Sequence, residues 1–197
     1  MAVDREGARA AVQAFLRALG HDPTDHPELA DTPARVTDAF ADELLAGYTV
    51  DLADLVVGGS EPIPEGPERP GLVVVRDLAV ASVCPHHLTT SLGRAAVCYL
   101  PGRRLLGLGT VAKLVDALSR RLTFQEAIGT RVVEAIMGYG QARGAFCLLG
   151  MTHGCLCARG ARQPGATVHT SAAAGVLADP GALGALSLLL GPDACRP

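Results

Sequence analysis

A cysteine and two adjacent histidines, Cys84, His86 and His87, are the residues whose types and spacing point most directly to chemistry. Further along the chain, His153 and Cys155 bring a second histidine and cysteine close together in sequence. Zinc binds such nitrogen and sulfur ligands tetrahedrally, and its catalytic sites use three protein ligands and one open position. We therefore expect Cys84, His87 and Cys155 to bind Zn²⁺. His86 and His153 remain beside the metal as candidates for proton transfer, so the set predicts a hydrolytic site.

Cys157 offers a second possible ligand set, because it lies two residues after Cys155. A site made of Cys84, His87, Cys155 and Cys157 would fill all four tetrahedral positions, and a closed structural site of this kind could not hydrolyse a substrate. The other cysteines belong to no motif, and we expect them to be packing or surface residues: Cys98, Cys147 and Cys195.

The composition excludes several classes of protein. A chain of 197 residues with 49% hydrophobic and 19% charged residues fits one globular domain with at most a small appendage. The apolar run Leu183 to Leu190 is much shorter than the roughly 20 residues that span a bilayer, so we expect a terminal core helix or an oligomer contact there. The N-terminus lacks the order of a secretion signal, which predicts a cytoplasmic protein without disulfides. A net charge of −3 predicts no nucleic-acid partner.

A stretch rich in proline and glycine, residues 58–70, divides the chain and predicts a linker. Before it, apolar residues at helical spacing predict a helix over residues 4–19. Thr32 followed by Pro33 is typical of a helix start, and this second helix should extend to about Ala46. The expected units are an N-terminal helical segment, the linker and a zinc-containing catalytic domain: residues 1–57, 58–70 and 71–197.

The part after the linker alternates between strand and helix patterns. Periodicity predicts two amphipathic helices, over residues 111–119 and 124–139. Runs rich in β-branched and apolar residues predict strands at 72–75, 78–83, 94–100, 145–151 and 166–173. Strands, two helices and strands again is an α+β order, with the helices on one face of the sheet. Such a sheet leaves edges that need partners, so we expect an oligomer.

Several blocks of the sequence resemble the signature motifs of the GTP cyclohydrolase I family, in the same order and spacing. The blocks are Asp31-Thr32-Pro33-Ala34-Arg35, Cys84-Pro85-His86-His87, Gln125-Glu126, and His153-Gly154-Cys155 followed by Ala158-Arg159-Gly160. The resemblance runs from about Asp31 to Gly175. It implies the tunnelling fold, an antiparallel sheet with two helices on one face, whose copies join into a barrel. It also implies a ring-shaped homo-oligomer of two stacked pentamers, a homodecamer.

The same resemblance implies an activity and roles for individual residues. The enzyme would open the imidazole ring of guanine hydrolytically at C8, release formate and recyclise the product to dihydroneopterin triphosphate, for pterin and tetrahydrofolate biosynthesis. His86 and His153 would be the catalytic histidines, and Glu126 would bind the N1 and N2 hydrogens of guanine. The substrate-binding residues implied in this way are Gln125, Glu126, Arg159, Arg35 and Lys113.

This sequence departs from the family pattern where the phosphates of the substrate should bind. Gly109-Thr110 stands in place of a Ser-Lys pair, Lys113 in place of an arginine, and Asp38 in place of a basic residue. The sequence therefore lacks a cation at Thr110 and has an anion in place of a cation at Asp38. At Lys113 an ammonium replaces a guanidinium, which can form two parallel hydrogen bonds to phosphate. Two alternatives to GTP cyclohydrolase I follow. One is a divergent zinc cyclohydrolase acting on a guanine compound with fewer or no phosphates, and the other is a non-catalytic, zinc-stabilised oligomeric paralogue.

Overall fold

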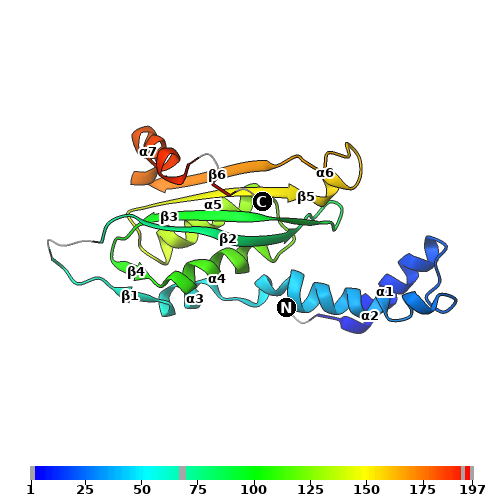
Figure 1. The fold of residues 1–197 in the computed structure, drawn as a ribbon. Helices are drawn as coiled ribbons and strands as arrows, with labels where there is room; N and C mark the ends of the chain where they lie inside the picture. The colour runs from blue at the N-terminus through cyan, green and yellow to red at the C-terminus, as the bar shows by residue number, and fades with distance from the viewer. Residues whose placement is uncertain (1–2, 67–69, 192–193, 196–197) are drawn as a thin grey trace.

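A four-stranded antiparallel sheet forms the centre of the structure, a computed structural model that describes residues 3–66, 70–191 and 194–195. The strand order is β2-β3-β5-β6, so β2 and β6 are the two edges (Figure 1). The strands are β2 (Val73–Val83), β3 (Thr90–Leu100), β5 (Gly144–His153) and β6 (Val168–Gly175). Strands β3 and β5 are long and pair antiparallel from end to end. The start of β3 therefore lies beside the end of β5, where Ser91 pairs with His153.

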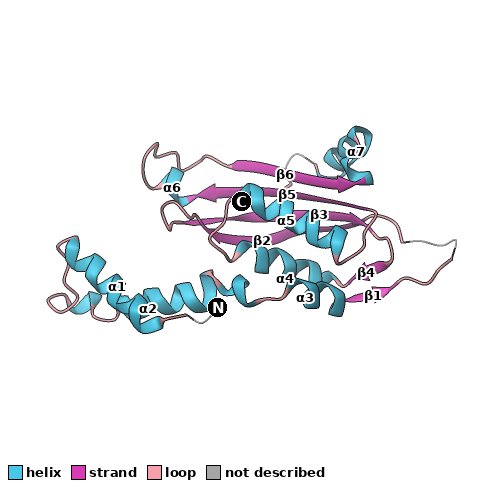
Figure 2. Cartoon of the chain, turned by 180° about the vertical axis from the view of Figure 1, so that it is seen from behind, coloured by secondary structure: helices cyan, strands magenta, loops and turns pink. Residues whose placement is uncertain are grey.

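Two helices, α4 (Leu108–Ser119) and α5 (Gln125–Gly138), cover one face of this sheet (Figure 2). Their buried side chains are those expected from the helical period: Val111, Leu114, Val115 and Leu118 on α4, and Ile128, Val132 and Ile136 on α5. Together with inward-facing residues of the strands they form the main hydrophobic core. The expected α+β architecture, with two helices on one face of an antiparallel sheet, is confirmed.

The last helix, α7 (Pro180–Leu190), packs on the opposite face of the sheet after a 3₁₀ turn, Val176–Ala178. Leu186 and Leu190 are buried there beside Phe146. The side chain of Leu188 is 86% exposed, so the apolar run serves only partly as a core helix. Within the described residues, no helix is long and apolar enough to cross a membrane.

The N-terminal segment is helical, as expected, and extends away from the sheet (Figure 1). It contains α1 (Arg5–Ala18), a 3₁₀ turn at Pro27–Leu29, and α2 (Thr32–Asp38). The helix predicted from Thr32 to about Ala46 is α-helical to Asp38 and continues with π winding over Ala39–Leu44. A 3₁₀ turn follows at Ala46–Thr49.

The predicted linker is wrong in part. Gly58 ends a short helix, α3 (Leu52–Gly58), and the next residues form strand β1 (Ser60–Pro62), which pairs with β4 (Arg104–Leu106). The pairing is stabilised by the Arg104 guanidinium, which donates hydrogen bonds to Ser60 Oγ at 2.7 Å and to the Ser60 carbonyl at 3.1 Å. Local composition cannot predict a pairing between two segments that are so distant in sequence. Residues 67–69 of the predicted linker lie outside the described residues.

The two strands predicted at 72–75 and 78–83 are one strand with a β-bulge. Pairing with β3 shifts register between Val75 and Leu78, and Asp77 takes a left-handed φ of 59°. A bulge inserts an extra residue in one strand and lets the pairing resume beyond it. The strand therefore continues without a break to Val83, directly before Cys84.

Candidate metal centre

The turn between β2 and β3 carries the first block of candidate residues. The amide of Cys84 donates to the Thr89 carbonyl at 2.9 Å, and the amide of Leu88 donates to the Cys84 carbonyl at 2.9 Å. Pro85 restricts the backbone inside this turn. These bonds close a compact loop, so Cys84 and His87 are held at the end of the sheet rather than on a free segment.

The second block reaches the same place through strand pairing. Ser91, near the start of β3, is the register partner of His153, the last residue of β5. The chain then turns directly into α6 (Gly154–Cys157), which carries Cys155. The Cys84 loop and α6 therefore adjoin each other.

The three predicted metal ligands meet at this point. One ligand atom each from Cys84, His87 and Cys155 lie within 4.8 Å of one another, and they are the candidate metal-binding group among the residues that the structure describes. Tetrahedral zinc bonds of about 2.0–2.3 Å require ligand atoms roughly 3.5 Å apart, so small side-chain adjustments suffice. Two thiols and one imidazole are a donor set that suits zinc.

Cys157 does not join this group. Its Sγ atom lies 4.0 Å from the Pro164 carbonyl oxygen, on the side of the loop that follows α6. The closed four-ligand alternative therefore receives no support from the geometry. A three-ligand site leaves the fourth tetrahedral position for water or substrate.

His153 is held by two side chains, one on each ring nitrogen. Its Nε2 atom lies 2.8 Å from Gln125 Oε1, and its Nδ1 atom lies 3.0 Å from Ser91 Oγ. Gln125 is buried, and its amide nitrogen donates to the carbonyls of Leu149 at 3.2 Å and Val168 at 2.9 Å. A direct contact of Gln125 with substrate, as the motif predicts, would require one of these bonds to break. Ser91 belongs to no motif, so sequence reasoning missed it.

His86 has a different environment, because its ring is exposed and lies against an aromatic side chain. The ring centroids of His86 and Phe124 are 5.1 Å apart, with the planes tilted by 53°. Phe124 is the N-cap residue of α5, so this contact places the start of α5 beside the ligand loop. Glu126, in the first turn of α5, is exposed to solvent, so its carboxylate is not desolvated by the protein. Phe124 is a second site residue that sequence reasoning missed.

The predicted phosphate-binding residues lie on separate elements of the fold. Arg159, just after α6, is exposed near it. The start of α4 is fixed at the other end of the sheet, where the Tyr99 hydroxyl bonds the backbone of Leu106 at 3.1 Å. Tyr99 and Ser91 are eight residues apart on β3, which is about 26 Å along a strand. Lys113 is exposed near the middle of α4, whose other end returns to Val83, beside Cys84, through the pairing of Val83 with Leu122.

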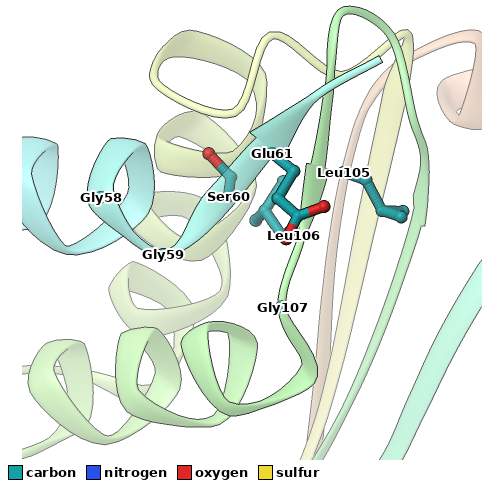
Figure 3. Close-up of a pocket in the computed structure, with 7 residues that line it drawn as sticks. All are labelled: Gly58, Gly59, Ser60, Glu61, Leu105, Leu106 and Gly107. Carbon is teal, nitrogen blue, oxygen red and sulfur yellow. The ribbon is translucent and has the colours of Figure 1, made fainter. Parts of the chain in front are cut away.

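A pocket of about 310 Å³ opens at the start of α4 (Figure 3). Its lining is glycine-rich and includes one ionisable side chain, that of Glu61: Gly58, Gly59, Ser60, Glu61, Leu105, Leu106 and Gly107. Thr110 is buried behind it and donates its hydroxyl proton to the Gly59 carbonyl at 2.8 Å. This hydrogen bond of Thr110 joins the end of α3 to α4. Among the described residues, the side chains that line the pocket include no cation that could bind an anion.

Two residues of α2, the departure Asp38 and the matching residue Arg35, have acidic or basic partners. The Asp38 carboxylate accepts hydrogen bonds from Arg5 at 3.0 Å and Arg9 at 3.3 Å, both on α1. Arg35 is exposed on α2 and pairs with Asp31 at 3.2 Å. Asp38 therefore joins the two N-terminal helices, while Arg35 remains largely open to solvent.

The cysteines that belong to no motif, Cys98, Cys147 and Cys195, are buried, in agreement with a packing role. Burial in apolar surroundings raises the pKa of the Cys98 thiol to about 11, and the same cause raises the pKa of Cys195 to about 11. Burial also raises the pKa of Cys147 far above its ordinary value. These thiols stay protonated near neutral pH, so they are poor nucleophiles and poor metal ligands.

The fold and the site together define an α+β protein with a candidate zinc centre at the end of an antiparallel sheet. The family model for GTP cyclohydrolase I matches residues 8–185. Among similar proteins, the GTP cyclohydrolase 1 of Leifsonia xyli subsp. xyli is 40% identical over 95% of this chain and 96% of its own length. The GTP cyclohydrolase 1 of Streptomyces griseus subsp. griseus is 37% identical over 91% of this chain and 87% of its own length. The chain therefore belongs to the GTP cyclohydrolase I family, a family of enzymes.

A solved structure is also similar to part of this chain. The apo form of the archaeosine synthase QueF-Like is 20% identical, with a TM-score of 0.46 over 55% of this chain and 97% of its own.

Proposed function

We propose that this protein is a zinc-dependent GTP cyclohydrolase I. In this proposal it opens the imidazole ring of guanine by hydrolysis at C8, releases formate and recyclises the product to dihydroneopterin triphosphate. The observation that carries the proposal is the meeting of Cys84, His87 and Cys155 beside two further histidines, in a chain of this family. Residues 71–197 form the catalytic domain, and residues 1–57 contribute to assembly.

The ligand set accounts for the choice of metal and for its reactivity. When bound, zinc would lower the pKa of a coordinated water toward about 7 and so supply a nucleophile at neutral pH. Cys84, His87 and Cys155 would hold the ion and leave one position open. The hydrogen-bonded loop of Cys84 restricts the movement of two of these ligands.

Proton transfer falls to His86 and His153, which are not needed as ligands. His86 is exposed, so its ring can reach a substrate without losing a hydrogen bond to the protein. His153 must exchange its bond to Gln125 or to Ser91 for one to the substrate. The ring opening needs a proton on a guanine nitrogen as the bond to C8 breaks, and both histidines stand close enough to the ligands to serve it.

Recognition of the base is assigned to Glu126. Its carboxylate is exposed at the start of α5, next to Gln125 and the ligand loop. A carboxylate can accept two hydrogen bonds from the N1 and N2 hydrogens of guanine, which is a charge-assisted bidentate contact. Arg159, exposed after α6, can approach the phosphates of the same substrate.

Assembly would complete the phosphate end of the site. Lys113 is exposed on α4, and α4 of a neighbouring copy could bring it to the ligands. The sheet has two edges, β2 and β6, and α1 exposes the apolar side chains Phe15 and Leu19. These features support the ring of two stacked pentamers that the family resemblance implies, with Arg35 and Lys113 serving a neighbour's site. Native mass spectrometry tests this: a monomer at micromolar concentration would contradict it.

A second candidate function is a cyclohydrolase for guanine compounds with fewer phosphates. It is favoured by two observations, the use of the Thr110 hydroxyl by Gly59 and the pairing of Asp38 with arginines of α1. Neither residue is available to bind phosphate. Formate release measured in parallel from GTP, GMP, guanosine and guanine separates the candidates. Formate from GTP alone supports the first, formate from guanosine at a similar rate supports the second, and formate from none would contradict both.

A further inference from the structure

A row of polar residues crosses three strands beside the metal centre, on the face covered by α5, and its two serines are buried. Ser82 on β2 is the register partner of Ser91 on β3, and Ser91 is the register partner of His153 on β5. The two serines are 3% and 2% exposed. The next positions along the same face are apolar and belong to the core, for example Val80 and Met151. Polar groups are costly to bury unless they are hydrogen-bonded, so the row requires partners.

The orientation of the Gln125 amide determines which nitrogen of His153 carries a proton. Because the amide nitrogen of Gln125 donates to two backbone carbonyls, its oxygen must be the atom that faces His153. A carboxamide oxygen only accepts, so Nε2 of His153 must carry the hydrogen. In the neutral ring Nδ1 is then an acceptor, and the hydroxyl of Ser91 is the donor that it meets at 3.0 Å.

The two nitrogens of His153 also face different surroundings. Nδ1 faces Ser91, which is buried and out of reach of a substrate. Nε2 faces Gln125, whose neighbour in the chain is Glu126, the residue assigned to the base of the substrate. Gln125 is as buried as Ser91, so a substrate reaches Nε2 only when the bond to Gln125 opens. The nitrogen that carries the hydrogen is the one on the side of α5, next to Glu126.

We infer that Ser91 is a positioning residue that donates to Nδ1 of His153 and so holds the imidazole in the tautomer that Gln125 selects, with its proton-bearing Nε2 directed toward the start of α5. This inference rests on the proposed cyclohydrolase function. Ser91 itself touches no substrate; it acts through His153, as second partners of active-site histidines do. Without the serine hydroxyl, the ring keeps one anchor, the bond to Gln125, and can rotate about it.

The kinetic test compares three variants of the zinc-loaded protein. Ser91→Ala removes the hydroxyl, Ser91→Thr keeps one, and Ser82→Ala is the matched control, a buried serine of the same row on the neighbouring strand. For Ser91→Ala we expect kcat to fall about tenfold, equivalent to ~1.4 kcal/mol, with KM and zinc content unchanged. Ser91→Thr should recover most of the loss, and Ser82→Ala should stay within about twofold of the wild type. A kcat for Ser91→Ala within that same range, or an equal loss in Ser82→Ala, would overturn the inference.

A spectroscopic readout tests the same contact without turnover. ¹⁵N spectra of histidine-labelled, zinc-loaded protein are recorded at about pH 8, above the ordinary histidine pKa of about 6.5, with His153 assigned by comparison with His153→Gln. We expect the His153 Nδ1 resonance of Ser91→Ala to move toward the value of a free, unprotonated ring nitrogen, while Ser82→Ala leaves it in place. An unmoved resonance contradicts the inference. If the wild type releases no formate, the proposed function fails, and this resonance alone decides the role of Ser91.

Discussion

The carboxylate of Asp38 accepts a hydrogen bond from the guanidinium of Arg5 at 3.0 Å, and this contact joins α2 to α1. Arg9 donates to the same carboxylate oxygen, and Arg5 also pairs with Asp42. Asp38, which replaces a basic residue of the family pattern, thus stabilises the contact between α1 and α2 in this chain. The same substitution therefore removes a cation expected to bind phosphate and provides the carboxylate that binds α1.

We predict that the docking of α1 weakens at acid pH. The hydrogen bond from Arg5 holds the pKa of Asp42 below its ordinary value of 3.8. A carboxyl with a lowered folded-state pKa stabilises the folded state above its unfolded-state pKa, and this stabilisation is lost as the pH falls through the lowered value. Hydrogen exchange of the α1 amides, corrected for intrinsic rates, should show protection that declines below pH 3.8.

The matched control for this prediction is Arg5→Ala, which removes the cause of the shift. In that variant the protection of α1 should be lower at neutral pH and should lose its acid-dependent step. If Arg5→Ala kept the same step as the wild type, another group would be responsible.

We predict that the two cysteines of α6 differ in their effect on metal binding. Cys155→Ala removes one of three ligands and should abolish stoichiometric zinc binding. Cys157→Ala should retain a full complement of zinc and near-normal activity, because its thiol faces Pro164 rather than the ligand group. Metal analysis of the purified variants measures this. Loss of zinc from Cys157→Ala would indicate the closed four-ligand site instead.

We predict that Glu126 recognises the guanidine-like edge of the base. Glu126→Gln loses the charge and one acceptor, so kcat/KM for GTP should fall about ten- to a hundredfold, as expected for hydrogen bonds to a charged group. The wild type should discriminate by a similar factor against inosine triphosphate, which lacks the N2 amino group. Formate release with both nucleotides provides the measurement. Equal use of the two nucleotides by the wild type would show that Glu126 has another role.

We predict that Lys113 contributes to the phosphates and not to the base. Lys113→Ala should lower kcat/KM for GTP by about tenfold, the worth of one charge-assisted contact. It should leave the value for guanosine unchanged. Arg131→Ala, which removes another exposed helical cation, is the control and should change neither. Equal losses for GTP and guanosine in Lys113→Ala would place Lys113 outside the phosphate site.

Periodicity and motif spacing were sufficient to predict the main elements and a group of residues that could hold a metal ion. The helices α4 and α5 follow from apolar side chains at helical spacing, because one face of each must be buried against the sheet. Cys84 and His87 could be paired with Cys155 because these residue types share a preference for zinc. The meeting of the three confirms the ligand group as a possible metal site.

Features that depend on pairing between distant segments could not be predicted in this way. Strand β1 forms because Ser60 pairs across to Leu106, and Ser91 enters the site because β3 and β5 pair with one particular register. Nothing in the local sequence around Ser91 indicates that register. The motif predicted a role for Gln125 in the site, and only the fold shows that its amide is bonded to His153 and to two backbone carbonyls.

The most direct test of the central claim is formate release from GTP by the purified, zinc-loaded protein, with Cys84→Ala as a metal-free control. The account predicts one formate for each GTP consumed, together with dihydroneopterin triphosphate, and neither product from Cys84→Ala. GTP that remains intact with the zinc-loaded wild type, or equal formate release by Cys84→Ala, would contradict a zinc-dependent cyclohydrolase.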